Sequence, residues 1–150
     1  MSIKNLLPGK IGLGGAPLGN MFRAIPEDEA HATVSEAWNL GVRYFDTAPL
    51  YGSGLSEIRM GEALSQYPRD EYVLSSKVGR IMLDEMEDPA KRDFGEKGGL
   101  FEHGLKNKIL NDYSADATLR SIEDSLKRLK TDRLDIVWIH DPAQDFYGDS

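Results

Sequence analysis

The chain has 150 residues, of which 40% are hydrophobic and 29% are charged, a composition typical of one globular domain. The net charge of −7 disfavours nucleic acid or an anionic membrane as a main partner, because both reward clustered lysine and arginine. The absence of cysteine excludes disulfides, thiolate metal sites and a cysteine nucleophile.

The N-terminal part of the chain predicts a short strand followed by a helix. Residues 1–15, MSIKNLLPGKIGLGG, lack an apolar stretch of signal-peptide length, and no segment reaches transmembrane length, so we expect a cytoplasmic protein. Within them, residues 11–15 predict a strand. A helix then begins at Pro26, has acidic residues in its first turn and ends at Gly41. Its apolar side chains recur at helical spacing: Ala30, Val34, Ala37 and Trp38.

Strands and helices alternate through the rest of the chain. Strands are predicted at residues 42–46, 72–77 and 134–140, and helices at residues 55–67 and 115–129. The last helix has Ser114 as its expected N-cap and an apolar stripe of Leu119, Ile122, Leu126 and Leu129. The alternation predicts an α/β fold with a parallel sheet, either an open doubly wound sheet or a closed (β/α)8 barrel.

One long segment, Val78 to Tyr113, shows no clear periodicity and contains several glycines among mixed charges. We therefore expect it to be irregular. Irregular segments of this length in compact domains are usually functional or disordered.

Four polar residues stand at or just after the ends of predicted strands: Asp46, Tyr51, Lys77 and His140. Each residue alone is more often a turn former, a solvated charge or a structural hydrogen-bonding group. At the carboxyl ends of barrel strands, however, the four side chains would face one another across the mouth, where catalytic residues gather.

This combination suits the transfer of a hydride to or from a carbonyl group. A tyrosine, whose reference pKa is about 10, acts as an acid or base at neutral pH when a cation stabilises its phenolate. Lys77 is the candidate cation, and Asp46 is its candidate ion-pair partner. His140 in its neutral form would donate a hydrogen bond to a carbonyl oxygen. The hydride itself must come from a cofactor, because no side chain stores one.

Several stretches resemble the aldo-keto reductase family in the family's own order. They are the GLGG strand, YFDTAPLYGSGLSE, LSSKVGR and SLKRLKTDRLDIVWIHDP, and they span most of the chain from Ile11 to Pro142. The resemblance implies a (β/α)8 TIM barrel, of which residues 1–150 would be the N-terminal half with about the first four βα units. It also implies NAD(P)-dependent redox chemistry with the catalytic residues Asp46, Tyr51, Lys77 and His140.

The same resemblance implies where the cofactor and substrate lie. Gly14, Gly15 and Ala16 would lie beneath the nicotinamide, with Asp46 beside it, and the cofactor would be NADP or NAD. Motifs such as DTAPLYGSGLSE place the chain near the branch that oxidises aldoses such as L-fucose, or pyridoxal, to lactones. A half barrel leaves open sheet edges, so the remaining half or a second chain would be needed to close the sheet. A non-catalytic binding or regulatory module of the same fold is the alternative.

Other patterns are weaker. The glycines near residues 12–15 and 52–54 do not fit the dinucleotide fingerprint GxGxxG, and each also fits a tight bend at a strand end. A metal site at His140, Asp141 and Asp145 is not expected, because the ligands are too few. His31 and His103 are expected at the surface, and both tryptophans, Trp38 and Trp138, in the core.

Overall fold

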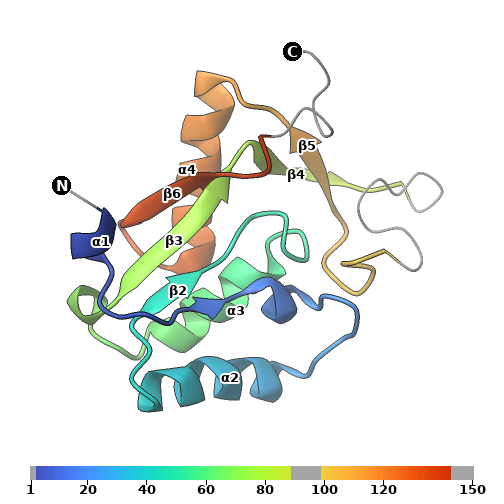
Figure 1. The fold of residues 1–150 in the computed structure, drawn as a ribbon. Helices are drawn as coiled ribbons and strands as arrows, with labels where there is room; N and C mark the ends of the chain where they lie inside the picture. Colours follow the sequence, from blue (N-terminus) through green and yellow to red (C-terminus); the bar gives the residue numbers. More distant parts are fainter. Residues whose placement is uncertain (1–2, 89–98, 143–150) are drawn as a thin grey trace.

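The computed structural model describes residues 3–88 and 99–142, and it contains a four-stranded parallel sheet in the order β1-β2-β3-β6 (Figure 1). The strands are β1 (Leu13–Gly14), β2 (Tyr44–Asp46), β3 (Val73–Val78) and β6 (Ile136–Ile139). The crossover helices are α2 (Glu27–Asn39), α3 (Leu55–Leu64) and α4 (Ala115–Leu129). Shorter elements are α1 (Ile3–Leu6), η1 (Ala16–Gly19) and η2 (Arg69–Glu71).

The core lies between one face of this sheet and the helices. Phe45 of β2 and Leu74 of β3 share a buried cluster with side chains of all three crossover helices, including Val34, Met60 and Leu129. Because neighbouring side chains of a strand point to opposite faces, Tyr44, Asp46, Ser75 and Lys77 face away from these helices. One face is therefore mainly apolar and covered by helices, and the other carries polar groups near the carboxyl ends of the strands, where a (β/α)8 barrel has its catalytic residues.

The prediction of an alternating, parallel α/β fold is confirmed, with β1, β2 and β6 shorter than expected. Pro26 is the N-cap of α2 and Gly41, with a φ of 91°, follows the end of that helix. Ser114 caps α4 by accepting a hydrogen bond from the backbone N–H of Ala117. The described residues contain no helix that is both long enough and apolar enough to cross a membrane.

The prediction of an irregular segment from Val78 to Tyr113 is wrong for the residues that the structure describes. Strands β4 (Arg80–Met86) and β5 (Asn107–Asn111) form an antiparallel pair outside the main sheet, with a register shift between Met82 and Met86. Only a few of their side chains are buried, such as Ile81 and Ile109, so the sequence alternation that marks a half-buried strand is weak. Residues 89–98 of this segment lie outside the described residues.

The predicted apolar stripe of α4 is also wrong in part. Leu129 is buried, but Leu119 is 63% exposed, and the other buried side chains of the helix are Ala117, Ser121 and Ser125. Small residues suit this face because α3 and α4 approach closely: a Cβ on Gly61 would lie 2.6 Å from the Cα of Leu129. Backbone proximity, and not the most apolar stripe, therefore sets the orientation of α4.

Candidate active site

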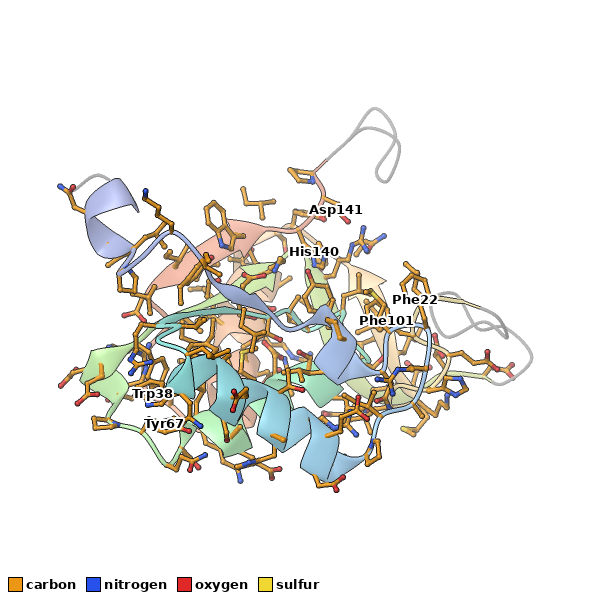
Figure 2. The ribbon with its side chains drawn as sticks, turned by 60° about the horizontal axis from the view of Figure 1, so that its bottom comes forward. Phe22, Trp38, Tyr67, Phe101, His140 and Asp141 are labelled. Carbon is orange, nitrogen blue, oxygen red and sulfur yellow. The ribbon has the colours of Figure 1, made fainter. Side chains whose placement is uncertain are left out.

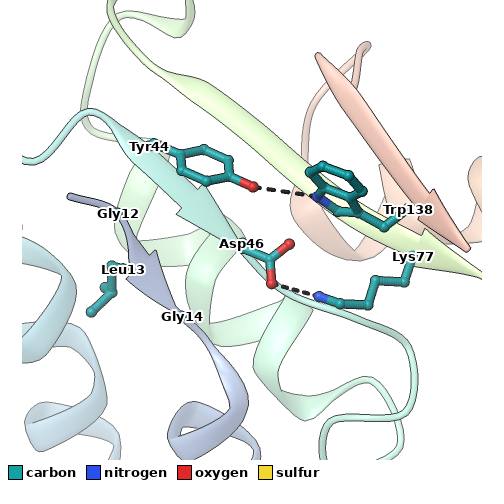
Figure 3. Close-up of a pocket in the computed structure, with 7 residues that line it drawn as sticks. All are labelled: Gly12, Leu13, Gly14, Tyr44, Asp46, Lys77 and Trp138. Atoms are coloured by element: carbon teal, nitrogen blue, oxygen red, sulfur yellow. Dashed lines mark hydrogen bonds and ion pairs between the residues drawn. The ribbon is translucent and has the colours of Figure 1, made fainter. Parts of the chain in front are cut away.

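The polar face of the sheet borders a cavity of about 380 Å³ (Figure 3). Its lining comes from all four strands and from the backbone just before β1. The lining residues are Gly12, Leu13, Gly14, Tyr44, Asp46, Lys77 and Trp138. Carboxylate, ammonium and aromatic N–H or O–H groups thus converge on one concave surface at the carboxyl ends of parallel strands.

Asp46 and Lys77 form an ion pair at the centre of this surface. Lys77 Nζ lies 2.5 Å from Asp46 Oδ2 and also donates to the carbonyl of Thr47 at 2.9 Å. Ser75 Oγ donates to the other carboxylate oxygen at 2.5 Å. The side chains of the pair are only 14% and 23% exposed, so the ammonium and the carboxylate are held in fixed positions and little screened by water.

Tyr51 lies in a tight turn after β2, in contact with two of the other predicted residues. The turn contains Gly52 at φ 66° and Gly54 at φ 89°, in the left-handed region that favours glycine. Lys77 Nζ lies 4.9 Å from the centroid of the Tyr51 ring, and the His140 ring meets that ring edge-on at 5.7 Å between centroids. The structure therefore brings Asp46, Tyr51, Lys77 and His140 together.

His140 directly follows β6 and is buried. Burial, and secondly the positive charge of Arg80, lower the pKa of His140 from 6.5 to about 4. The imidazole is therefore neutral at pH 7, so one ring nitrogen carries a proton and can donate a hydrogen bond, and the other can accept one. The backbone is fixed as well, because its N–H donates to Val78 and its carbonyl accepts from the hydroxyl of Tyr113.

The residues predicted to hold a cofactor differ in their surroundings. Gly14 is exposed at the cavity, and a Cβ there would meet nothing within 4 Å. Gly15 is buried, and a Cβ there would lie 2.7 Å from the Oγ of Ser56, so packing behind the sheet requires this glycine. Ala16 is partly buried at the start of η1, beside the cluster that contains Tyr51.

A chain of hydrogen bonds behind the ion pair was missed from the sequence. Trp138 Nε1 donates to the hydroxyl of Tyr44 at 3.3 Å, and Tyr44 shares a hydrogen bond of 3.0 Å with Ser75, which in turn bonds Asp46. The expectation of a core position is thus wrong for Trp138, which is 40% exposed, and confirmed for Trp38. The signal was present, because Tyr44 and Ser75 each lie two residues before a predicted site residue and so share its face.

The described residues contain no group of three or more histidine, aspartate or glutamate side chains placed to hold a metal ion. Asp145, one member of the metal site considered from the sequence, lies outside the described residues. His31 and His103 are exposed, as predicted.

Comparison with known proteins identifies relatives along most of the chain. Residues 10–148 match the model of the aldo/keto reductase family. The chain is 41% identical over 135 residues to a D-threo-aldose 1-dehydrogenase of a Pseudomonas species, covering 89% of this chain and 40% of that protein. It is 35% identical over 142 residues to the pyridoxal 4-dehydrogenase of Microbacterium luteolum, covering 93% of this chain and 41% of that protein.

A solved structure supports the same assignment. The aldo-keto reductase of Klebsiella pneumoniae in complex with NADPH superposes with a TM-score of 0.57 at 27% identity, covering 86% of this chain and 34% of that one. The barrel prediction is thereby confirmed, since the described strands and helices match the first βα units of such an enzyme. The chain spans about two fifths of the length of the two dehydrogenases that it matches.

Proposed function

The chain belongs to the aldo/keto reductase family, and from this we propose that it is part of an NAD(P)-dependent oxidoreductase acting on small carbonyl compounds or cyclic hemiacetals. The observation that carries the proposal is the cluster at the strand ends: the Lys77–Asp46 ion pair with the rings of Tyr51 and His140 beside it. A phenol, an ammonium and a neutral imidazole together supply what a carbonyl redox reaction requires: a proton donor or acceptor, a stabilising cation and a hydrogen-bond donor to the substrate oxygen.

The residues around the cavity fit the nicotinamide end of a dinucleotide. Gly14 adds no side chain to the cavity wall, and the space beyond its Cα is open, so a flat ring has access to the surface beside Asp46 and Lys77. Gly14, Ala16 and Asp46 are the residues we assign to it, with Gly15 supporting the bend from behind. When bound, the nicotinamide supplies or accepts the hydride.

Each polar residue then has a defined part in the reaction. Tyr51 Oη takes the proton from the substrate hydroxyl during oxidation and returns it to the developing alkoxide during reduction. The ammonium of Lys77 stabilises negative charge on that oxygen, and Asp46 holds the ammonium in place through the bond to Nζ. The neutral imidazole of His140 donates a hydrogen bond to the substrate oxygen and keeps it at Tyr51.

The relatives suggest the substrate class. One is named for an aldose and the other for pyridoxal. Both compounds form cyclic hemiacetals, in which the oxidised carbon carries one hydroxyl and one ring oxygen. Removal of a hydride from that carbon and of the hydroxyl proton leaves a lactone. We propose a substrate of this kind, with NADP or NAD as the acceptor.

We propose further that residues 1–150 are the N-terminal half of one barrel domain. Strands β1 and β6 are the two edges of the described sheet, each paired on one side only. Val137 and Ile139 of β6 are 39% and 60% exposed, so this edge carries apolar side chains that a neighbouring strand and helix would cover. Further strands of the same chain, or of a second chain, would close the sheet.

The test is turnover by the full-length protein. NAD or NADP is supplied with L-fucose, D-arabinose and pyridoxal, and the absorbance of the reduced nicotinamide is followed. We expect turnover that falls by at least about 100-fold in Tyr51→Phe, as is typical when a general acid–base is removed. Tyr67→Phe is the matched control, because Tyr67 stacks on Trp38 far from the cluster.

Two outcomes would argue against the proposal. Unchanged turnover in Tyr51→Phe would remove this tyrosine from the reaction. Tight binding of either nucleotide without turnover of any carbonyl or hemiacetal substrate would favour the non-catalytic binding or regulatory module instead.

A further inference from the structure

Residues 99–105, which begin the second described part of the chain, lie against the loops after β1 and β2. The carbonyl of Leu100 accepts a hydrogen bond from the N–H of Phe22 at 2.7 Å, and that of His103 accepts one from Asn20 Nδ2 at 2.8 Å. The N–H of Leu105 donates to the carbonyl of Gly52 at 3.0 Å. Figure 2 shows Phe22 and Phe101 together at this end of the molecule. The segment is thus attached at three points to the rim that carries Tyr51.

Three glycines bring these backbones into direct contact. A Cβ on Gly104 would lie 2.6 Å from the Cα of Gly52, and a Cβ on Gly52 would lie 2.3 Å from the carbonyl oxygen of Gly19. Real Cβ atoms do not approach other atoms so closely. The loop after β1, the turn after β2 and the segment 99–105 therefore stack backbone on backbone, immediately beside Tyr51.

The side chain of Asn20 connects this backbone contact to the helices by hydrogen bonds. This side chain is 6% exposed, and its Oδ1 accepts hydrogen bonds from Arg59 Nη1 at 2.7 Å and from the N–H of Ile25 at 3.1 Å. Its Nδ2 makes the bond to His103 described above. One buried amide thus connects α3, the approach to α2 and the segment 99–105, so the segment is held by the core of the domain.

The segment 99–105 places the side chain of Phe101 beside Tyr51. It is 9% exposed and packs in a cluster with Leu50 and Ile109. Its ring lies 5.8 Å from the Tyr51 ring between centroids, at an interplanar angle of 28°, which is a stacked arrangement. Among the described residues, Lys77 lies over the Tyr51 ring with its ammonium and His140 meets that ring edge-on with its imidazole, whereas Phe101 stacks an apolar ring on it.

We propose that Phe101 is a positioning residue for Tyr51. Its ring, held by the segment 99–105, fixes the plane and direction of the phenol against Lys77 and His140. The role in catalysis rests on the function proposed above, but the role in positioning does not, because it concerns contacts within this chain alone.

The consequence for the reaction follows from geometry. A proton moves efficiently only when donor and acceptor are held at hydrogen-bond distance, and a displacement of about 1 Å costs about 100-fold in rate. Without the stacked ring of Phe101, the phenol of Tyr51 can adopt orientations that the ring now blocks. We expect the loss to fall on kcat, because Phe101 is buried and is not one of the residues that line the cavity beside Asp46 and Lys77.

The kinetic test compares three variants of the full-length protein. We expect Phe101→Leu, which keeps an apolar side chain but removes the ring, to lower kcat by about 10- to 100-fold with KM changed by less than about 3-fold. Phe101→Tyr keeps the ring and restores most of the rate. Leu100→Ala is the matched control, because this neighbouring side chain is 52% exposed and its backbone bond to Phe22 is kept.

A second measurement reads positioning without turnover. The protein is labelled with 3-fluorotyrosine, and the ¹⁹F resonance of Tyr51 is assigned among the six tyrosines of this chain and any others by its loss in Tyr51→Phe. We expect this resonance to shift and broaden in Phe101→Leu and to stay unchanged in Leu100→Ala. Ring protons of Phe101 and Tyr51 in the unmodified protein should also show a nuclear Overhauser contact, which tests the stacking even if Phe101→Leu does not fold.

The outcomes separate the two proposals. Absence of the Overhauser contact, or a Tyr51 resonance that is the same in Phe101→Leu, would overturn the positioning role. A shifted resonance with kcat unchanged in an active enzyme would overturn the role of this positioning in catalysis. A shifted resonance in a protein that turns over none of the substrates would leave the positioning role standing and refute the proposed function.

Discussion

Lowering the pH should destabilise this protein through His140. The folded state lowers the pKa of His140 from 6.5 to about 4, first because the ring is buried and second because Arg80 is positive. Between these two values the unfolded chain binds a proton at this site and the folded chain does not. The free energy of unfolding therefore falls as the pH falls through this window, and the contribution of His140 is fully present only above about pH 6.5.

The size of this effect follows from the two pKa values. One pKa unit corresponds to about 1.36 kcal/mol. The full loss, below both values, amounts to about 3 kcal/mol, and about 2.5 kcal/mol of it is reached by about pH 4.5. Because His140 is only 7% exposed, screening by solvent reduces this figure little. Such a loss is a large share of the 5–15 kcal/mol by which domains are stable.

The assay is urea denaturation of the unmodified protein and of His140→Gln at several pH values. Glutamine does not titrate, so the difference in unfolding free energy between the two proteins isolates the histidine from all the carboxylates. Between about pH 7.5 and about pH 4.5, we expect the unmodified protein to lose about 2.5 kcal/mol of unfolding free energy relative to His140→Gln. A difference that stays constant with pH, or a His140 imidazole that titrates near 6.5 by NMR, would refute the reasoning.

Three further substitutions test the packing around the site. Arg128→Met should cost about 3–5 kcal/mol in urea denaturation, because it leaves the fully buried carboxylate of Glu57 without its cation. Gly52→Ala should lower the free energy of unfolding by about 1–3 kcal/mol because of its φ of 66°, and by more because of the close backbone contact. Gly9→Ala, where a Cβ would point into open space, should leave the free energy of unfolding unchanged. Ser114→Ala should cost about 1 kcal/mol, measured by thermal unfolding, because α4 loses its N-cap bond.

Controls and contrary results are available for each substitution. Arg120→Met removes an exposed ion pair on the same helix as Arg128 and should change stability by less than about 1 kcal/mol. Equal effects of these two arginine substitutions would mean that burial of Glu57 does not matter. Equal effects of the two glycine substitutions would contradict the backbone contact at Gly52. An unchanged melting temperature in Ser114→Ala would show that the cap bond adds nothing.

Much of the fold was predictable because local rules act on neighbouring residues. The order of strands and helices follows from periodicity, and the start of α4 follows from one capping serine at position 114. The β4–β5 pair was missed because its strands pair with each other and bury few side chains. Trp138 was misplaced because an apolar run does not reveal which face of the strand borders the cavity.

The candidate site divides in the same way. The sequence by itself determined which residue types end each parallel strand, and the geometry of parallel sheets then requires Asp46, Lys77 and His140 to meet at one edge. Only the tertiary structure decided what surrounds them: the hydroxyl of Ser75 on the carboxylate, the charge of Arg80 near the imidazole, and the ring of Phe101 on Tyr51. Phe101 lies 50 positions after Tyr51 in the chain, and no local pattern records a contact that forms only when three loops pack through glycines 19, 52 and 104.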